Sequence, residues 1–193
     1  MALILILLGA VAALVGAGCS SQELTLTSLD HHQNYTQGFT HAFAGRNVNG
    51  DIDLVLIDDA MNNAIKGVAD ASPVRQAMHF RIVWAPTRDM KAVTSNASVS
   101  WFVIGRSRPK DLLEYRGIGF VVLQEDNATM TFNVRSAQLK AAGNHGNLID
   151  PVGKSQLQGA VTAVADFQAV RKVLAQIQAV VASAGNPIPL AAR

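Results

Sequence analysis

The densest cluster of side chains able to bind a metal ion lies at Asp30, His31 and His32. Imidazole nitrogens and carboxylate oxygens are common ligands of divalent cations. Adjacent side chains of a strand point to opposite faces, so both histidines could reach one ion only from a loop. The polar stretch 29–35 predicts such a loop. We therefore keep His31 and His32 as ligand candidates, without predicting a metal centre.

A second group of candidates comes from the acidic stretch 51–59. Asp51 and Asp53 are two residues apart, so they share one face of a predicted strand. Two carboxylates whose environments push their pKa values apart can act as a general acid and a general base. Aspartates on a strand face are also typical of a solvated surface or a guarded sheet edge. Asp51 and Asp53 are therefore ligand candidates, and no residue is predicted to be catalytic.

Other catalytic patterns are missing from the sequence. The remaining histidines, His41, His79 and His145, do not form a His-x-His or His-Glu-x-x-His spacing. The chain has no Gly-x-Ser-x-Gly, and the glycine-containing stretch 143–147 lacks the lysine of a phosphate-binding loop. We expect no cofactor.

Alternating apolar and polar residues predict most of the elements that must position these side chains. The strongest signal is a hairpin of strands 37–44 and 51–57, with the turn-forming pair Asn49-Gly50 between them. A short helical turn capped by Asp58 or Asp59 is expected next. Further strands are expected at 24–27, 78–84, 99–104, 117–123, 129–135 and 156–164, with a long loop at 143–153.

The apolar period changes from that of a strand to that of a helix after Asp166. Asp166 is a good N-cap, and Gly185-Asn186-Pro187 ends the predicted helix. Its apolar stripe consists of Phe167, Val170, Leu174, Ile177 and Val181. The fold class is therefore predicted to be α+β, a mainly antiparallel sheet of six to eight strands packed by one C-terminal amphipathic helix. A β-sandwich with an edge helix is the alternative.

The first nineteen residues indicate export. Residues 3–15 form an apolar run that suits the core of a signal peptide and is shorter than the roughly 20 residues that span a bilayer. Three small residues, Gly-Ala-Gly at 16–18, precede Cys19, the one cysteine of the chain. Because Cys19 has no partner for a disulfide, its placement points to another use of the thiol.

The stretch Val15-Gly16-Ala17-Gly18-Cys19 resembles the lipobox of bacterial lipoproteins. The resemblance implies cleavage before Cys19 and lipidation of its sulfur, and Ser20 in place of Asp allows sorting to an outer membrane. Ordinary secretion and a short uncleaved anchor are the alternatives. We accordingly expect a signal peptide at 1–18, a lipidated cysteine and short tether at 19–23, a single β-rich domain at 24–185 and a frayed tail at 186–193.

Composition narrows the range of partners. The net charge is +2, and no cluster of lysine and arginine is dense enough to indicate nucleic-acid binding. A loose basic belt in the middle third could contact anionic lipid headgroups or an anionic glycan. This belt consists of Arg75, Arg81, Arg88, Arg106, Arg108 and Lys110.

The sequence thus favours a lipoprotein of the cell envelope, anchored to a membrane through Cys19. We expect it to be a non-catalytic binding or structural module whose partner is an envelope protein or glycan. A small-ligand or metal-binding protein that uses His31, His32 and the aspartates is one alternative. A hydrolase acting on envelope material is the other, and it requires Asp51, Asp53 and one histidine to converge in a cleft.

Overall fold

Nine strands and two helices make up the part of the chain that this computed structural model describes, which is residues 22–83, 93–105, 111–126 and 128–184. In chain order the elements are β1 (Gln22–Ser28), β2 (Asn34–Phe39), β3 (His41–Arg46), β4 (Ile52–Ile57), α1 (Asp59–Ile65), β5 (Val74–Ile82), β6 (Val93–Gly105), β7 (Leu112–Glu125), β8 (Thr129–His145), β9 (Ser155–Ala165) and α2 (Phe167–Ser183).

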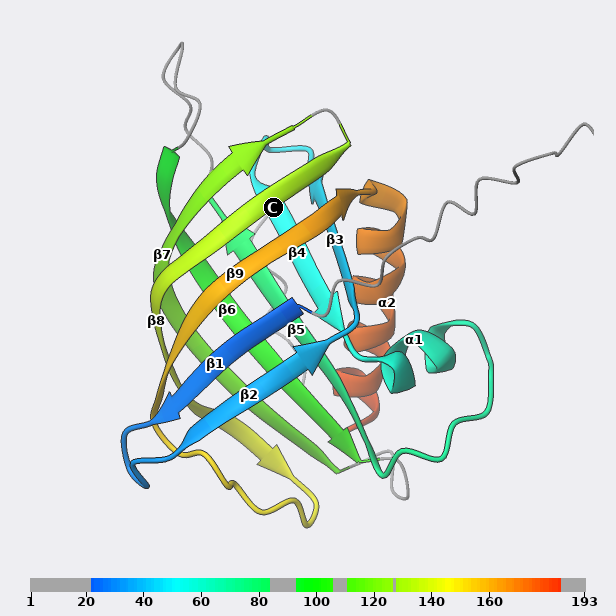
Figure 1. The fold of residues 1–193 in the computed structure, drawn as a ribbon. Coiled ribbons are helices and arrows are strands. Elements are labelled where there is room, and N and C mark those ends of the chain that lie inside the picture. The colour runs from blue at the N-terminus through cyan, green and yellow to red at the C-terminus, as the bar shows by residue number, and fades with distance from the viewer. Residues whose placement is uncertain (1–21, 84–92, 106–110, 127, 185–193) are drawn as a thin grey trace, which may run out of the picture.

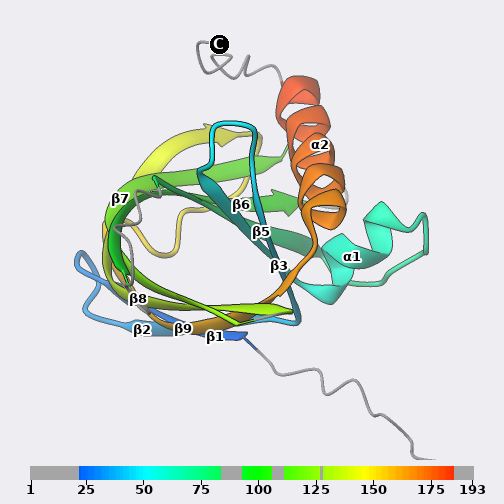
Figure 2. The same ribbon diagram turned by 90° about the horizontal axis from the view of Figure 1, so that it is seen from above.

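Seven of these strands, β3 to β9, close into a barrel (Figures 1 and 2). Each strand from β3 to β9 pairs antiparallel with the next, including β4 and β5, which α1 separates in sequence. The ring closes where β9 pairs parallel with β3, at Phe43 with Val164 and Ala44 with Ala165. β1 pairs with the first half of β9, and β2 pairs with β1. The fold is therefore mainly β with helices, as predicted, but the strands close into a barrel and form neither the expected helix-packed sheet nor the alternative β-sandwich.

The barrel closes because its longest strands bend sharply. β8 departs from regular pairing with β7 and β9 near Arg135, where a bulge bends the strand. Gly117 and Gly119 face the interior beside this bend. A Cβ on Gly117 would overlap the carbonyl oxygen of Gln138 and lie 2.7 Å from its carbonyl carbon. Only glycine therefore lets β7 and β8 approach each other this closely.

Side chains fill the barrel interior as one hydrophobic cluster. The rings of Trp101 and Tyr115 stack within it, with centroids 4.7 Å apart. Phe39, Phe80 and Phe132 pack fully buried in the same cluster. The interior is thus a packed core, which leaves the outer surface of the barrel for binding.

Helix α2 packs on the outside of the barrel over β3 and β4 (Figure 2). Asp166 is its N-cap and accepts a hydrogen bond from the Ala169 N–H at 2.9 Å, which confirms the predicted start. The buried residues of the helix are Val170, Val173, Ile177 and Val181, with Leu174 partly buried. They cluster with six residues of the barrel wall, Val55, Ile57, Ala77, Phe102, Ile104 and Leu112. The short helix α1 with Asp58 as N-cap is confirmed as well.

A loop closes one end of the barrel. The Tyr115 hydroxyl donates to the Asp150 carboxylate, which also accepts the backbone N–H groups of Val152 and Gly153 at 2.9 and 2.8 Å. Burial alone would raise the pKa of Asp150. These hydrogen bonds outweigh that effect, so the net pKa lies below its usual value. Burial and the neighbouring carboxylate raise the pKa of Tyr115. The predicted loop 143–153 is therefore partly wrong, because β8 continues to His145 and the rest is fixed against the core.

No helix of the described ranges is long and apolar enough to cross a membrane. The apolar run at 3–15 and Cys19 lie outside those ranges.

Candidate functional site

A groove of about 540 Å³ lies on the outer wall of the barrel, across β5 to β8. We call it the β5–β8 groove. It is lined by Arg81, Val83, Asn96, Ala97, Ser98, Ile118, Gly119, Phe120, Ser136 and Gln138.

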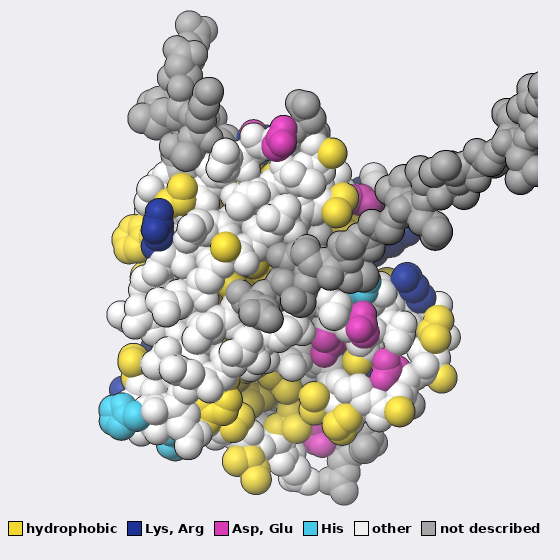
Figure 3. Space-filling view, in the orientation of Figure 1, with side chains coloured by type: hydrophobic (Ala, Val, Ile, Leu, Met, Phe, Trp, Pro, Cys, Tyr) yellow, Lys and Arg dark blue, Asp and Glu magenta, His cyan; other side chains and the backbone are white. Residues whose placement is uncertain are grey.

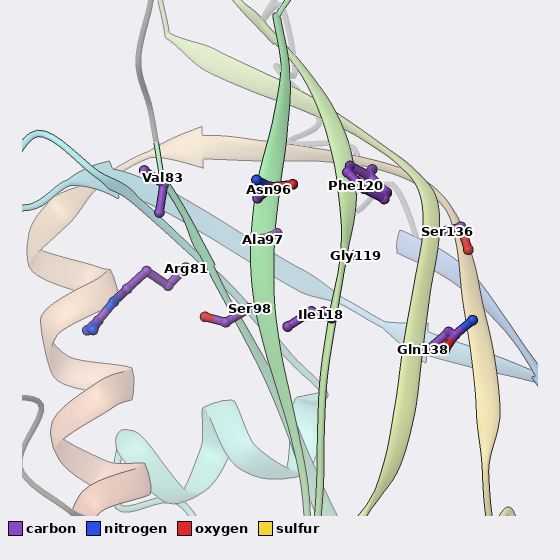
Figure 4. A pocket seen from close by; sticks show the side chains of 10 residues that line it. All are labelled: Arg81, Val83, Asn96, Ala97, Ser98, Ile118, Gly119, Phe120, Ser136 and Gln138. Carbon is purple, nitrogen blue, oxygen red and sulfur yellow. The ribbon is translucent and has the colours of Figure 1, made fainter.

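Strand pairing arranges the outward side chains of the groove in two parallel rows (Figure 4). The register places Arg81, Ser98, Ile118 and Gln138 side by side on four successive strands. The second row consists of Asn96, Phe120 and Ser136, which are also cross-strand partners on successive strands. Val83 lies next to this row. Neighbours in a row are cross-strand partners, whose Cβ atoms lie about 5 Å apart. One ligand can therefore touch several of them.

The centre of the groove is an exposed apolar ridge. Ile118 is 76% exposed and Phe120 is 55% exposed, which is high for side chains of these types. Both lie on β7, and their inward-facing neighbours on this strand are Gly117 and Gly119. The alternation of the strand thus places glycine inside and large apolar residues outside. This is the reverse of the usual pattern and suggests a contact surface.

A buried cluster of charged side chains adjoins the end of the groove near β4 and includes the lining residue Arg81. The Asp53 carboxylate of β4 contacts Nε2 of His79 at 2.8 Å and Nε of Arg81 at 3.5 Å. The side-chain amide of Asn47 donates to the other Asp53 oxygen at 3.2 Å. Burial raises the pKa of Asp53, but the hydrogen bond and the charge of His79, followed by the charge of Arg81, outweigh it and hold the pKa below its usual value.

Arg81 leaves part of its guanidinium group available to the groove. Asp53 contacts only its Nε, and no described residue bonds to its two terminal nitrogens. Among the lining residues that the structure describes, none carries a carboxylate. Arg116 is the next residue of β7 on the same face as Ile118. Its Nε forms an ion pair with Oε1 of Glu114 at 2.6 Å, and its cross-strand partner on β8 is Lys140. The groove therefore favours an anionic group near Arg81.

The structure separates Asp51 from the cluster that Asp53 forms. Asp53 is only 3% exposed, because His79, Arg81 and Asn47 surround its carboxylate. Asp51 lies in the turn before β4, and its backbone N–H donates to the Asn47 side chain at 3.1 Å. The expectation that both aspartates project from a solvated strand face is thus wrong for Asp53. The hydrolase hypothesis requires Asp51, Asp53 and one histidine to converge in a cleft. The Asp53 carboxylate does contact His79, but this contact is buried and does not lie in an open cleft.

His31 and His32 lie in the turn between β1 and β2, at the opposite end of the barrel from Asp51 and Asp53 (Figure 1). The neighbouring Asp30 carboxylate accepts the backbone N–H of Lys154 at 2.8 Å. Within the described part of the chain, no three histidines, cysteines or acidic residues are grouped so that they could hold a metal ion. The structure therefore does not bring the four ligand candidates together.

Sequence reasoning identified Arg81 only as a member of the basic belt and passed over Phe120 and Ile118. Of the other belt residues, Arg75 lies on β5, while Arg88, Arg106, Arg108 and Lys110 lie outside the described ranges. The signal that could have revealed the groove is the segment Gly117-Ile118-Gly119-Phe120. Its large apolar residues occupy one face of a strand, and its glycines occupy the other.

Comparisons of the chain with protein-family models, with curated proteins and with solved structures find no match. An exposed aromatic ring, amide and hydroxyl side chains on both flanks and a partly engaged arginine can bind a polar ligand with an apolar face. They provide no nucleophile with an adjacent base.

Proposed function

We propose that this chain is an exported lipoprotein, anchored through Cys19, that acts as a non-catalytic binding module of the cell envelope. Its β5–β8 groove binds acidic sugar residues of an envelope glycan. The observation that carries the proposal is the exposed ring of Phe120 beside Ile118, flanked by hydrogen-bonding side chains and by Arg81.

The chemistry of a sugar ring matches this lining. One face of the ring presents C–H groups, which pack against an aromatic side chain, while hydroxyl and acetamido groups at its edge need hydrogen-bond partners. Asn96 and Gln138 each offer a donor and an acceptor, and Ser98 offers a hydroxyl. Arg81 suits a carboxylate or phosphate substituent, because guanidinium nitrogens form charge-assisted hydrogen bonds with such groups.

The position of the anchor is compatible with this role. Only Ser20 and Ser21 separate Cys19 from the first residue of β1, so a lipid on Cys19 would hold the barrel next to the bilayer. β1 is joined to the barrel through β9, and the groove extends over β5 to β8 on another part of the wall (Figure 2). A glycan could therefore reach the groove while the protein stays on its membrane.

We predict that Phe120→Ala weakens glycan binding at least tenfold, because the variant loses the ring that packs on the sugar. Binding would be measured by calorimetric titration of the mature protein with two probes. The first is the disaccharide of N-acetylglucosamine and N-acetylmuramic acid, which carries a carboxylate, and the second is a neutral N-acetylglucosamine oligosaccharide. Arg81→Gln should weaken binding of the acidic probe more than that of the neutral one.

The matched control is Val164→Ala, because Val164 is an exposed apolar residue of β9 that lies outside the groove. It should leave both affinities unchanged. Equal affinities of wild-type protein and Phe120→Ala, or no binding of either probe to wild-type protein, would contradict the glycan proposal.

A further inference from the structure

The outermost strand of the sheet, β2, has a free edge. Within the described residues it pairs with β1 alone and ends the strand order. Its sequence, Asn-Tyr-Thr-Gln-Gly-Phe, contains neither charge nor proline. Folded proteins usually protect a sheet edge with lysine, proline, a bulge or a covering element, since an open edge offers hydrogen-bonding groups to another strand. In the part of the chain that the structure describes, β2 pairs regularly with β1 and shows none of these features.

On the outer face next to this edge, the described side chains are uncharged, and Glu23 of β1 is the cross-strand partner of Gly38. Thr36 of β2, Thr25 of β1 and Gln158 of β9 are successive cross-strand partners that point outward. The other outward residues of this wall include Asn34, Thr27, Gln156, Ala160 and Thr162. Figure 3 shows few charged side chains over β1, β2 and β9. An approaching strand therefore meets little charge on this wall.

Hydrophobic side chains adjoin the free edge on its inner side. Figure 3 shows them gathered just below the position of β2 in Figure 1, on the side away from β1. Tyr35 of β2 and Leu148 are partly buried against the interior cluster. A strand added to β2 would extend the wall over this region and remove apolar surface from water.

We propose that the β2 edge binds the β2 edge of a second copy of this chain, in antiparallel pairing. Such an interface is two-fold symmetric, so the edge must be complementary to itself. A neutral edge meets this condition, because two charged edges would repel each other. With Thr36 opposite its own copy, the outward residues Asn34, Thr36 and Gly38 of both strands lie on one common face.

The symmetry suits two proteins on one membrane. The two-fold axis of antiparallel edge pairing is perpendicular to the sheet, so the starts of both β1 strands lie at the same height along this axis and can face one membrane. Six residues of strand span only about 20 Å, which makes the pairing alone a small interface. Confinement to a membrane would raise its effective concentration, although the pairing itself depends neither on the lipid nor on the groove.

The test places a photo-cross-linking amino acid at position 36 of the full-length chain in its native membrane. Irradiation should give a product of twice the protein's mass, in which position 36 is joined to the β2 segment of another copy. The same amino acid at position 158 is the control. Gln158 is also exposed on the same face, but it lies two strands from the edge, about 14 Å from the added strand.

A second pair of variants measures how much a charge at the edge changes the dimer fraction. Thr36→Lys brings two positive charges together and should lower the dimer fraction at least fivefold, whereas Gln158→Lys should leave it unchanged. Thermal unfolding of both variants checks that each remains folded. A product with a different protein, equal cross-linking from both positions or no dimer in wild-type membranes would overturn the proposal. Each of these results can be obtained whether or not the groove binds a glycan.

Discussion

Gly117→Ala is expected to destabilise the barrel by at least about 4 kcal/mol, a large share of the roughly 5–15 kcal/mol that stabilises a typical domain. The added Cβ would overlap the carbonyl oxygen of Gln138 and lie 2.9 Å from the Leu139 side chain. Because the obstacle is the backbone of β8, relief requires the β7–β8 pairing to shift. That pairing extends over most of both strands and cannot move at one residue only.

Gly38→Ala is the matched control, because Gly38 also lies in a strand but no atom lies within 4 Å of its added Cβ. Its stability should equal or slightly exceed that of the wild type. Urea unfolding followed by tryptophan fluorescence measures both changes. A Gly117→Ala variant within 1 kcal/mol of the wild type would refute the close approach of β7 and β8.

Asp53→Ala is expected to cost roughly 3 kcal/mol in the free energy of unfolding, the size typical when one partner of a buried ion pair is removed. The substitution leaves His79 and Arg81 without their shared carboxylate, and Asn47 without an acceptor. Asp51→Ala is the control, since this aspartate lies outside the cluster and should have a much smaller effect. Similar losses for the two variants would contradict the buried cluster.

The same cluster predicts a dependence of stability on pH. The pKa of Asp53 is lower in the folded protein than its ordinary value of 3.8, so the folded state favours the charged carboxylate. This contribution is fully present above the unfolded pKa and disappears as the pH falls through the folded pKa. The difference in unfolding free energy between wild type and Asp53→Ala should therefore be constant from pH 7 to 5 and shrink below pH 4. A difference that stays constant down to pH 2 would disprove this role.

The elements predicted well are those with local signals. Asp166 and the apolar period after it define α2, and Asp58 caps α1 as expected. Asn49-Gly50 correctly marks the turn before β4, and Gly50 has the positive φ that such a turn requires. Each of these features depends on residues within a few positions of one another, so the sequence alone contains the information.

Closure of the barrel depends on contacts that the sequence pattern does not contain. β9 pairs with β8, with β1 and, over two residues, with β3, which lies more than 110 residues earlier. Alternation indicates that a strand has an inner face, but it does not distinguish an open sheet from a closed one. β8 bends at Arg135, where the predicted strand ends, but it continues to His145, past the predicted start of the loop at 143.

The candidate site also depends on contacts between residues far apart in the sequence, which the pattern of residues does not reveal. Asp53 is in a strand, as predicted, but its partner His79 is contributed by β5 through cross-strand pairing 26 residues away. The groove likewise combines four strands, and its central residue Phe120 is an ordinary strand residue when read alone. The side chains that suggest chemistry in sequence, His31 and His32, lie in a turn far from it.

The most direct test of the account is the intact mass of the protein extracted from cell membranes, measured beside the Cys19→Ala variant. We predict a chain that begins at Cys19 and carries added acyl mass, and we predict that Cys19→Ala lacks both this cleavage and this mass. Such a result would place the barrel on a membrane, within reach of envelope glycans and of its own copies. An unmodified chain cut at another residue would contradict the lipid anchor and the envelope function built on it.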